Sequence, residues 1–100
     1  MAPVLVERMF QKVVERNNWG RRTFHLGGEQ LSPRVRKIML RFPDGSTRYA
    51  PVVWRSESQS VNDMGHRETI WSEVPYAKVA IYGGKFDVPL WSEDLEATVL

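Results

Sequence analysis

The sequence predicts an α+β fold in which an N-terminal amphipathic helix packs on a curved, mainly antiparallel sheet of about five or six strands, followed by a short C-terminal helical tail. Three observations predict it. Apolar residues recur at helical spacing near the N-terminus, they alternate at strand spacing after residue 21, and Ser92 precedes a run of carboxylates near the C-terminus. The 100 residues are enough for a single domain, 1–100, with one core.

The first expected element is a helix over residues 4–16. Its apolar residues recur on one helical face and its charged residues occupy the other. Pro3 suits the first turn, where its missing N–H is not needed, and Gly20 accepts a left-handed stop. The apolar face needs a cover, so we expect the sheet to pack against it. That face holds Val6, Met9, Phe10, Val13 and Val14.

After residue 21 the period is that of strands. The strongest case is 34–42, where Ile38, Leu40 and Phe42 share one face. Turns are predicted at 27–28, at 43–46 and at 83–84, where glycine supplies permissive backbone angles. Pro51 lacks a backbone donor, which predicts an edge position or a bulge. The predicted strands are 22–26, 34–42, 47–55, 67–74, 77–82 and 85–90.

Two further segments complete the predicted fold. Residues 56–66 are polar and almost free of apolar anchors, which predicts the longest loop of the chain. Ser92 suits the cap of a short terminal helix, because Glu93, Asp94 and Glu96 would lie in its positively polarised first turns.

The composition excludes several classes of site. The chain has no cysteine, so it forms no disulfide and no thiolate metal site. Its apolar runs fall well short of the roughly 18 residues that a membrane span needs. Residues 1–6 are too short for the core of a signal peptide. We therefore expect a soluble, cytoplasmic protein that makes no membrane contact.

Charge is unevenly distributed along the chain. Residues 1–55 hold eleven Lys and Arg against four Asp and Glu, whereas residues 56–100 hold three against eight. Such asymmetry is typical of a charged partner surface. Alternatively, strands from the two halves pair, and the charges meet as ordinary exposed ion pairs.

The basic residues of the first strands carry one function hypothesis, the binding of RNA or single-stranded DNA. Cations neutralise phosphates, and exposed aromatic rings such as Tyr49 stack on unpaired bases. The candidate residues are Arg34, Arg36, Lys37, Arg41, Arg48 and Arg55.

The four tryptophans carry the leading hypothesis, a non-catalytic protein-binding domain. A domain this small can hardly enclose four indoles, and exposed Trp is a common anchor of protein interfaces. Its size is typical of small inhibitor or adaptor proteins of phages and plasmids that act on a host protein complex. The sequence leaves open whether copies of the chain associate. The candidate interface residues are Trp54, Trp71, Trp91, Glu73 and Asp87.

A third hypothesis, a small enzyme, depends on the polar residues of 56–68. No strand-turn-helix nucleophile elbow frames these serines, and His25 and His66 lack the spacing of paired metal ligands. We therefore predict no catalytic residue, no cofactor and no metal. The residues that this hypothesis would use are Ser56, Glu57, Ser58, Ser60, Asp63, His66 and Glu68.

Overall fold

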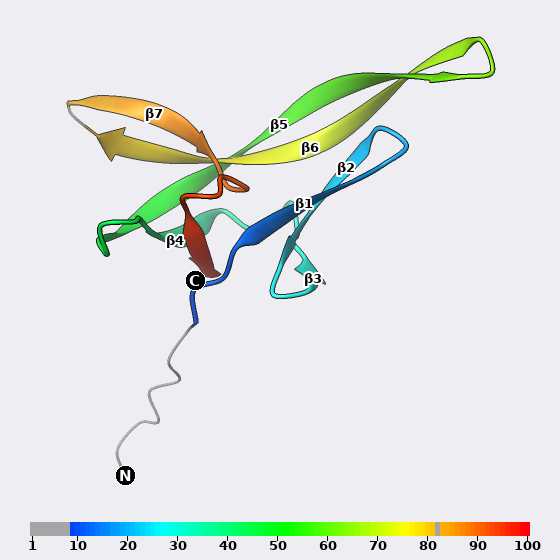
Figure 1. Ribbon diagram of the computed structural model, residues 1–100. Helices are drawn as coiled ribbons and strands as arrows, with labels where there is room; N and C mark the ends of the chain where they lie inside the picture. The colour runs from blue at the N-terminus through cyan, green and yellow to red at the C-terminus, as the bar shows by residue number, and fades with distance from the viewer. Residues whose placement is uncertain (1–8, 82) are drawn as a thin grey trace.

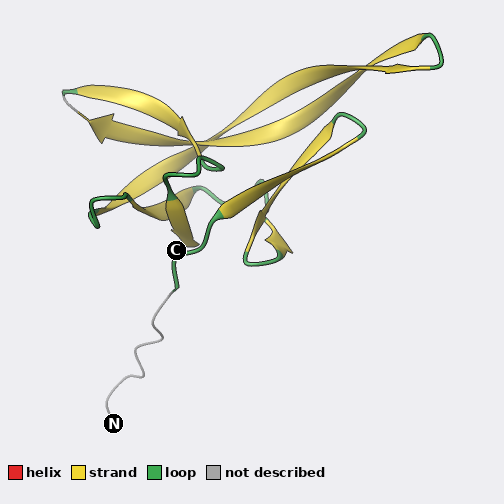
Figure 2. Cartoon of the chain, in the orientation of Figure 1, coloured by secondary structure: helices red, strands yellow, loops and turns green. Residues whose placement is uncertain are grey.

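The computed structural model describes residues 9–81 and 83–100, and this part of the chain consists of strands and turns without a helix (Figure 2). Accordingly, none of the described residues forms a helix long and apolar enough to cross a membrane. The described part of the fold is therefore all-β, not α+β. The strands are β1 Val13–Asn18, β2 Arg21–Leu26, β3 Glu29–Gln30, β4 Lys37–Arg41, β5 Thr47–Asp63, β6 His66–Ile81, β7 Gly84–Pro89 and β8 Glu96–Val99.

The strands form two antiparallel sheets, one in the order β1-β2-β3 and one in the order β7-β6-β5-β4-β8. The long strand β5 changes partner along its length. Residues 47–51 pair with β4 and residues 52–63 pair with β6. The change falls at Pro51, which cannot donate a backbone hydrogen bond. Pro51 thus lies in an inner strand, at the point where the ladder with β6 ends.

The core lies where the two halves of the large sheet and the small sheet meet. Burying these side chains supplies the main favourable contribution to folding. The large sheet and its connections contribute the buried apolar residues Ile38, Leu40, Val52, Val74, Ala77, Val79, Leu90 and Ala97. The small sheet contributes Val13 of β1 and Phe24 of β2, and Leu31 follows directly after β3.

The predicted N-terminal helix is wrong for the residues that can be tested. Residues 13–16 belong to β1, which pairs with β2 from Val13 opposite Leu26 onward; residues 1–8 lie outside the described part. Val13 is buried and Val14 is 51% exposed, so the two valines follow the period of a strand. Their β-branched side chains also favour a strand. The small sheet, not a helix, packs on the large one.

The predicted C-terminal helix is also wrong. Ser92 begins a tight turn in which the N–H of Leu95 donates to the Ser92 carbonyl at 3.1 Å. The chain then enters β8, which pairs with β4 and buries Ala97. Ala97 also exchanges backbone hydrogen bonds with Gln11, so this segment is bonded on both of its edges. Glu96, expected at a helix start, pairs instead with Arg41.

The predicted 56–66 loop is wrong too, because these residues continue β5 and pair with β6. The predicted strands 67–74 and 77–82 are joined through Pro75 into β6, which ends at Ile81; residue 82 lies outside the described part. The described residues have principal extents of 63 × 37 × 22 Å and a radius of gyration of 16.1 Å, against about 13 Å for a compact domain of this length. The β5–β6 hairpin causes the elongation, since it projects from the body of the fold (Figure 1).

Candidate binding surface on the β5–β6 arm

The projecting part of the β5–β6 hairpin, residues 56–73, is here called the arm. Its two strands pair without a break out to Asp63 opposite His66. They are joined by Met64 and Gly65, both with positive φ (49° and 84°), as in the tight turns that suit twisted hairpins. An isolated two-stranded hairpin is only marginally stable in water. The arm therefore needs support along one face.

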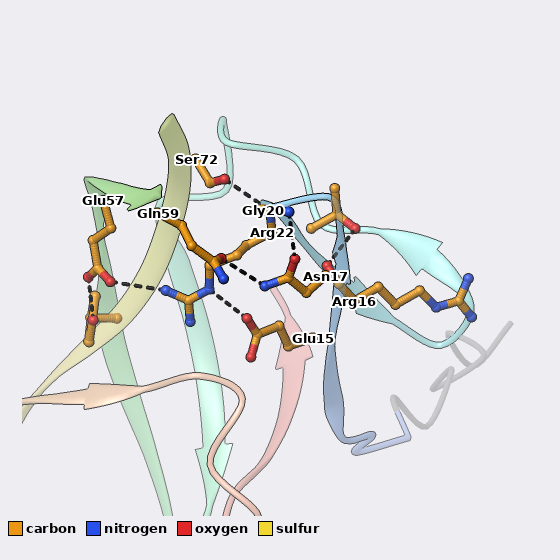
Figure 3. A network of polar contacts seen from close by, with 10 residues as sticks. Glu15, Arg16, Asn17, Gly20, Arg22, Glu57, Gln59 and Ser72 are labelled. Carbon is orange, nitrogen blue, oxygen red and sulfur yellow. Dashed lines mark hydrogen bonds and ion pairs between the residues drawn. The ribbon is translucent and has the colours of Figure 1, made fainter. Parts of the chain in front are cut away.

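That support comes from the β1–β2 hairpin, which packs along the arm (Figure 3). The half-buried Arg22 on β2 pairs with Glu15 on β1 and with Glu57 on β5, the latter at 3.0 Å. Its guanidinium also lies 5.5 Å from the ring centre of Phe24 and 5.1 Å from that of Trp91. Burial lowers the pKa of Arg22, but the hydrogen bonds and charges of the two carboxylates outweigh burial and raise the pKa above its ordinary value. Arg22 thus fastens both hairpins to each other.

Neutral groups extend the same support toward the far end of the arm. The N–H of Arg22 donates to the Ser72 hydroxyl at 2.9 Å, and the Asn17 amide donates to Gln59 at 2.9 Å. At the tip of the β1–β2 hairpin, the buried Gly20 lies against Val61. This side of the arm, comprising Glu57, Gln59, Val61, Glu68, Ile70 and Ser72, is called the braced face.

The opposite side of the arm, the outer face, points into solvent. Directly opposed residues of an antiparallel pair share a face, and on this side Ser58 lies opposite Trp71. Trp71 is 64% exposed, and it is the one apolar residue of residues 56–73 on this face. The outer face comprises Ser56, Ser58, Ser60, Asn62, Arg67, Thr69, Trp71 and Glu73.

A hollow of about 190 Å³ adjoins Trp71 between β2, β6 and the segment that follows β3. Leu31 and Pro33 contribute apolar walls, and Trp54 closes one side. The indole N–H of Trp54 donates to the Val35 carbonyl at 2.9 Å, which holds this ring in place. The hollow is large enough for a side chain of a partner.

The candidate interface residues of the sequence analysis separate into two groups. Trp71 and Glu73 lie on the outer face, and Trp54 lines the adjoining hollow. Trp91 is half-buried under Arg22, and Asp87 forms an ion pair on β7. Neither of these two lies on the outer face.

The nucleic-acid candidates do not form one free basic surface. Arg41 pairs with Glu96 and Arg55 with Asp87. Arg48 donates to the Ala80 carbonyl at 2.7 Å. Both ion pairs join the basic half of the chain to the acidic half, so part of the charge asymmetry is neutralised within the molecule. The remaining candidates, Arg34, Arg36 and Lys37, are exposed where the chain enters β4.

The catalytic candidates fall on opposite sides of the arm. Ser56, Ser58 and Ser60 belong to the outer face, whereas His66 lies opposite Asp63 in line with the braced face. Within residues 9–81 and 83–100, no group of three His, Asp or Glu side chains is placed to hold a metal ion. His25 lies on β2, where its Nε2 is 3.1 Å from the Thr23 hydroxyl.

The sequence analysis missed the special positions of Trp19 and Met64. Both occupy hairpin tips with positive φ, 56° and 49°, and are 60% and 94% exposed. Bulky residues rarely adopt this conformation. A signal was present, since each stands between Asn or Asp and a glycine, which favours a two-residue hairpin turn.

No family model, no curated protein and no solved structure matches this chain. Its function is therefore argued from the geometry of the arm.

Proposed function

We propose that this protein is a non-catalytic protein-binding module, an inhibitor or adaptor, that docks on its partner through the outer face of the arm. The observation that carries the proposal is Trp71, which is 64% exposed in the middle of a face whose other residues are polar or charged. Leaving an indole in water forgoes the free energy that its burial would contribute. A partner surface that covers Trp71 would recover it.

The chemistry of the outer face suits protein recognition. A tryptophan supplies a large contact area at small cost in side-chain entropy, and neighbouring hydroxyls adapt their hydrogen bonds to the partner, as in antibody paratopes. The hollow beside Trp71 and Trp54 gives a partner side chain a place to insert. Because Arg22 and its partners fix the arm on its braced face, little ordering is needed when the outer face binds.

The test compares two variants in the cells from which the protein comes. Tagged full-length chain is used to capture partners, which are identified by mass spectrometry and then measured by titration. We expect Trp71→Ser to weaken the captured complex about 30-fold or more, as for an interface hot spot of about 2 kcal/mol. Tyr49→Ser removes a similarly exposed ring from the β4–β5 ladder and should leave affinity unchanged. Equal affinity of the Trp71 variant and the wild type would disprove the proposal.

Salt dependence separates this proposal from the RNA alternative. Binding through phosphate contacts weakens steeply with added salt, whereas an interface centred on Trp71 changes modestly. The matched variant replaces Arg34, Arg36 and Lys37 with Gln, because the side chains of these exposed candidates form neither an ion pair nor a hydrogen bond within residues 9–81 and 83–100. We expect this variant to bind the partner as the wild type does.

A further inference from the structure

A second hollow, of about 230 Å³, lies at the far end of the braced face. We call it the tip recess. Its walls combine an indole and two aliphatic side chains with two carboxylates, a composition that the outer face does not have. It is lined by Trp19, Val61, Asp63, Glu68 and Ile70.

Backbone geometry fixes the apolar walls of the tip recess. Gly20 is buried against Val61 and Ile70, with no room for a side chain of its own on the Val61 side. The preceding residue, Trp19, is thereby held with a φ of 56° at the edge of the recess. Trp19 remains 60% exposed, so its ring is available to a ligand.

The sheet register places the two carboxylates beside these walls. Glu68 lies opposite Val61, and Asp63 lies two residues beyond Val61 on the same face. Both are exposed, and within residues 9–81 and 83–100 neither forms an ion pair. Arg67, the neighbouring cation, lies opposite Asn62 and therefore on the other face of the arm.

We propose that the tip recess binds an arginine or lysine side chain of a protein partner. The negative face of an indole attracts a cation, and the two unpaired carboxylates add to the same attraction. The aliphatic stem of a basic side chain can cover Val61 and Ile70 while its charged end lies between Asp63 and Glu68. This inference rests on the proposed function and deepens it, because it states that the partner presents a basic side chain.

The recess can be tested without the natural partner. The probe is an acetylated and amidated Gly-Ser peptide with one central arginine, and the control peptide carries citrulline, which has nearly the same shape but no charge. The readout is the indole N–H resonance of Trp19 in a titration followed by NMR. We expect the arginine peptide to shift this resonance to saturation and the citrulline peptide to bind at least about tenfold more weakly.

Two double variants make the result specific. Asp63→Asn with Glu68→Gln should weaken arginine-peptide binding about tenfold or more. Glu29→Gln with Asp94→Asn removes the same charge from exposed positions elsewhere and should leave it within about twofold. The inference falls if the Trp19 resonance does not respond, if citrulline binds equally well, or if both double variants weaken binding alike.

The Trp71→Ser variant separates this inference from the proposed function. It should keep the Trp19 response to the arginine peptide, because Trp71 lies on the other face of the arm. A silent tip recess together with loss of partner binding in Trp71→Ser would overturn the inference and leave the proposed function standing. If instead the tip recess binds the arginine peptide and the Trp71→Ser variant binds the partner as tightly as the wild type does, only the proposed function is overturned.

Discussion

Gly20 at the tip of one hairpin lies so close to Val61 on another that a Cβ atom on Gly20 would overlap the Cγ2 methyl of Val61. This contact closes the far end of the support between β1–β2 and the arm. Position 20 requires glycine for two reasons: a side chain would overlap Val61, and the backbone has a φ of +81°.

Gly20→Ala should therefore destabilise the fold by about 2–4 kcal/mol, the sum of left-handed backbone strain and overpacking. The measurement is the free energy of unfolding in urea. Gly45→Ala is the matched control, since Gly45 has a φ of +88° but open space around it. It should cost only the backbone strain, about 1 kcal/mol. Equal losses in the two variants would show that the contact with Val61 does not matter.

Arg22→Met should destabilise the protein by about 1–3 kcal/mol, because Glu15 and Glu57 would keep their charges at a half-buried site without a cation. Amide hydrogen exchange should also quicken in the arm around Ser72, where the support is released. The control is Arg21→Met at the exposed neighbouring position, with an expected change within about 0.5 kcal/mol.

Tyr76 should make the protein sensitive to alkali. Its hydroxyl donates to Glu57, and this hydrogen bond, together with burial, raises the pKa of Tyr76. A raised pKa stabilises the fold below the unfolded pKa of about 10, and this contribution is lost as the pH rises through the higher folded value. Unfolding free energies measured from about pH 9 upward should fall less in Tyr76→Phe than in the wild type. A parallel fall in both proteins would contradict the assignment.

Asp44 should titrate below its ordinary pKa of 3.8, because it accepts hydrogen bonds from the hydroxyl and then the backbone N–H of Ser46. Such a lowered pKa contributes stability above the unfolded value, which is lost as the pH falls through the folded value. Ser46→Ala should raise the pKa of Asp44 toward 3.8 in an NMR titration of the carboxyl carbon. Ser92→Ala, at another turn, should leave the Asp44 titration unchanged.

The parts of the fold that the sequence predicts well are strands with one buried face. In residues 37–41, Ile38 and Leu40 are buried while Lys37 and Arg41 are exposed, so the alternation is visible in the sequence. For the described residues, the helix prediction was wrong although the apolar residues of 4–16 fit a helical period as a set. Within residues 9–16 only Val13 is buried, and it pairs with β2. Long-range pairing overrode the local pattern.

The arm could not be predicted from hydrophobic alternation. Trp71 is the only apolar side chain of its outer face. Along β5, the serines of that face alternate with Glu57 and Gln59, which lie on the braced face. A strand with polar residues on both faces resembles a loop in composition. The exposure of at least one tryptophan was expected from their number, but which of them is exposed depends on the register, which places Trp71 opposite Ser58.

The partner change of β5 at Pro51 has a mechanical consequence. A single covalent strand runs from the arm into the ladder with β4, where residues 47–51 lie opposite residues 37–41. A load applied to the arm along its axis therefore reaches the β4–β5 ladder as shear across several backbone hydrogen bonds at once, and does not unzip them one after another. The arm is thus anchored as a tether that would resist pulling.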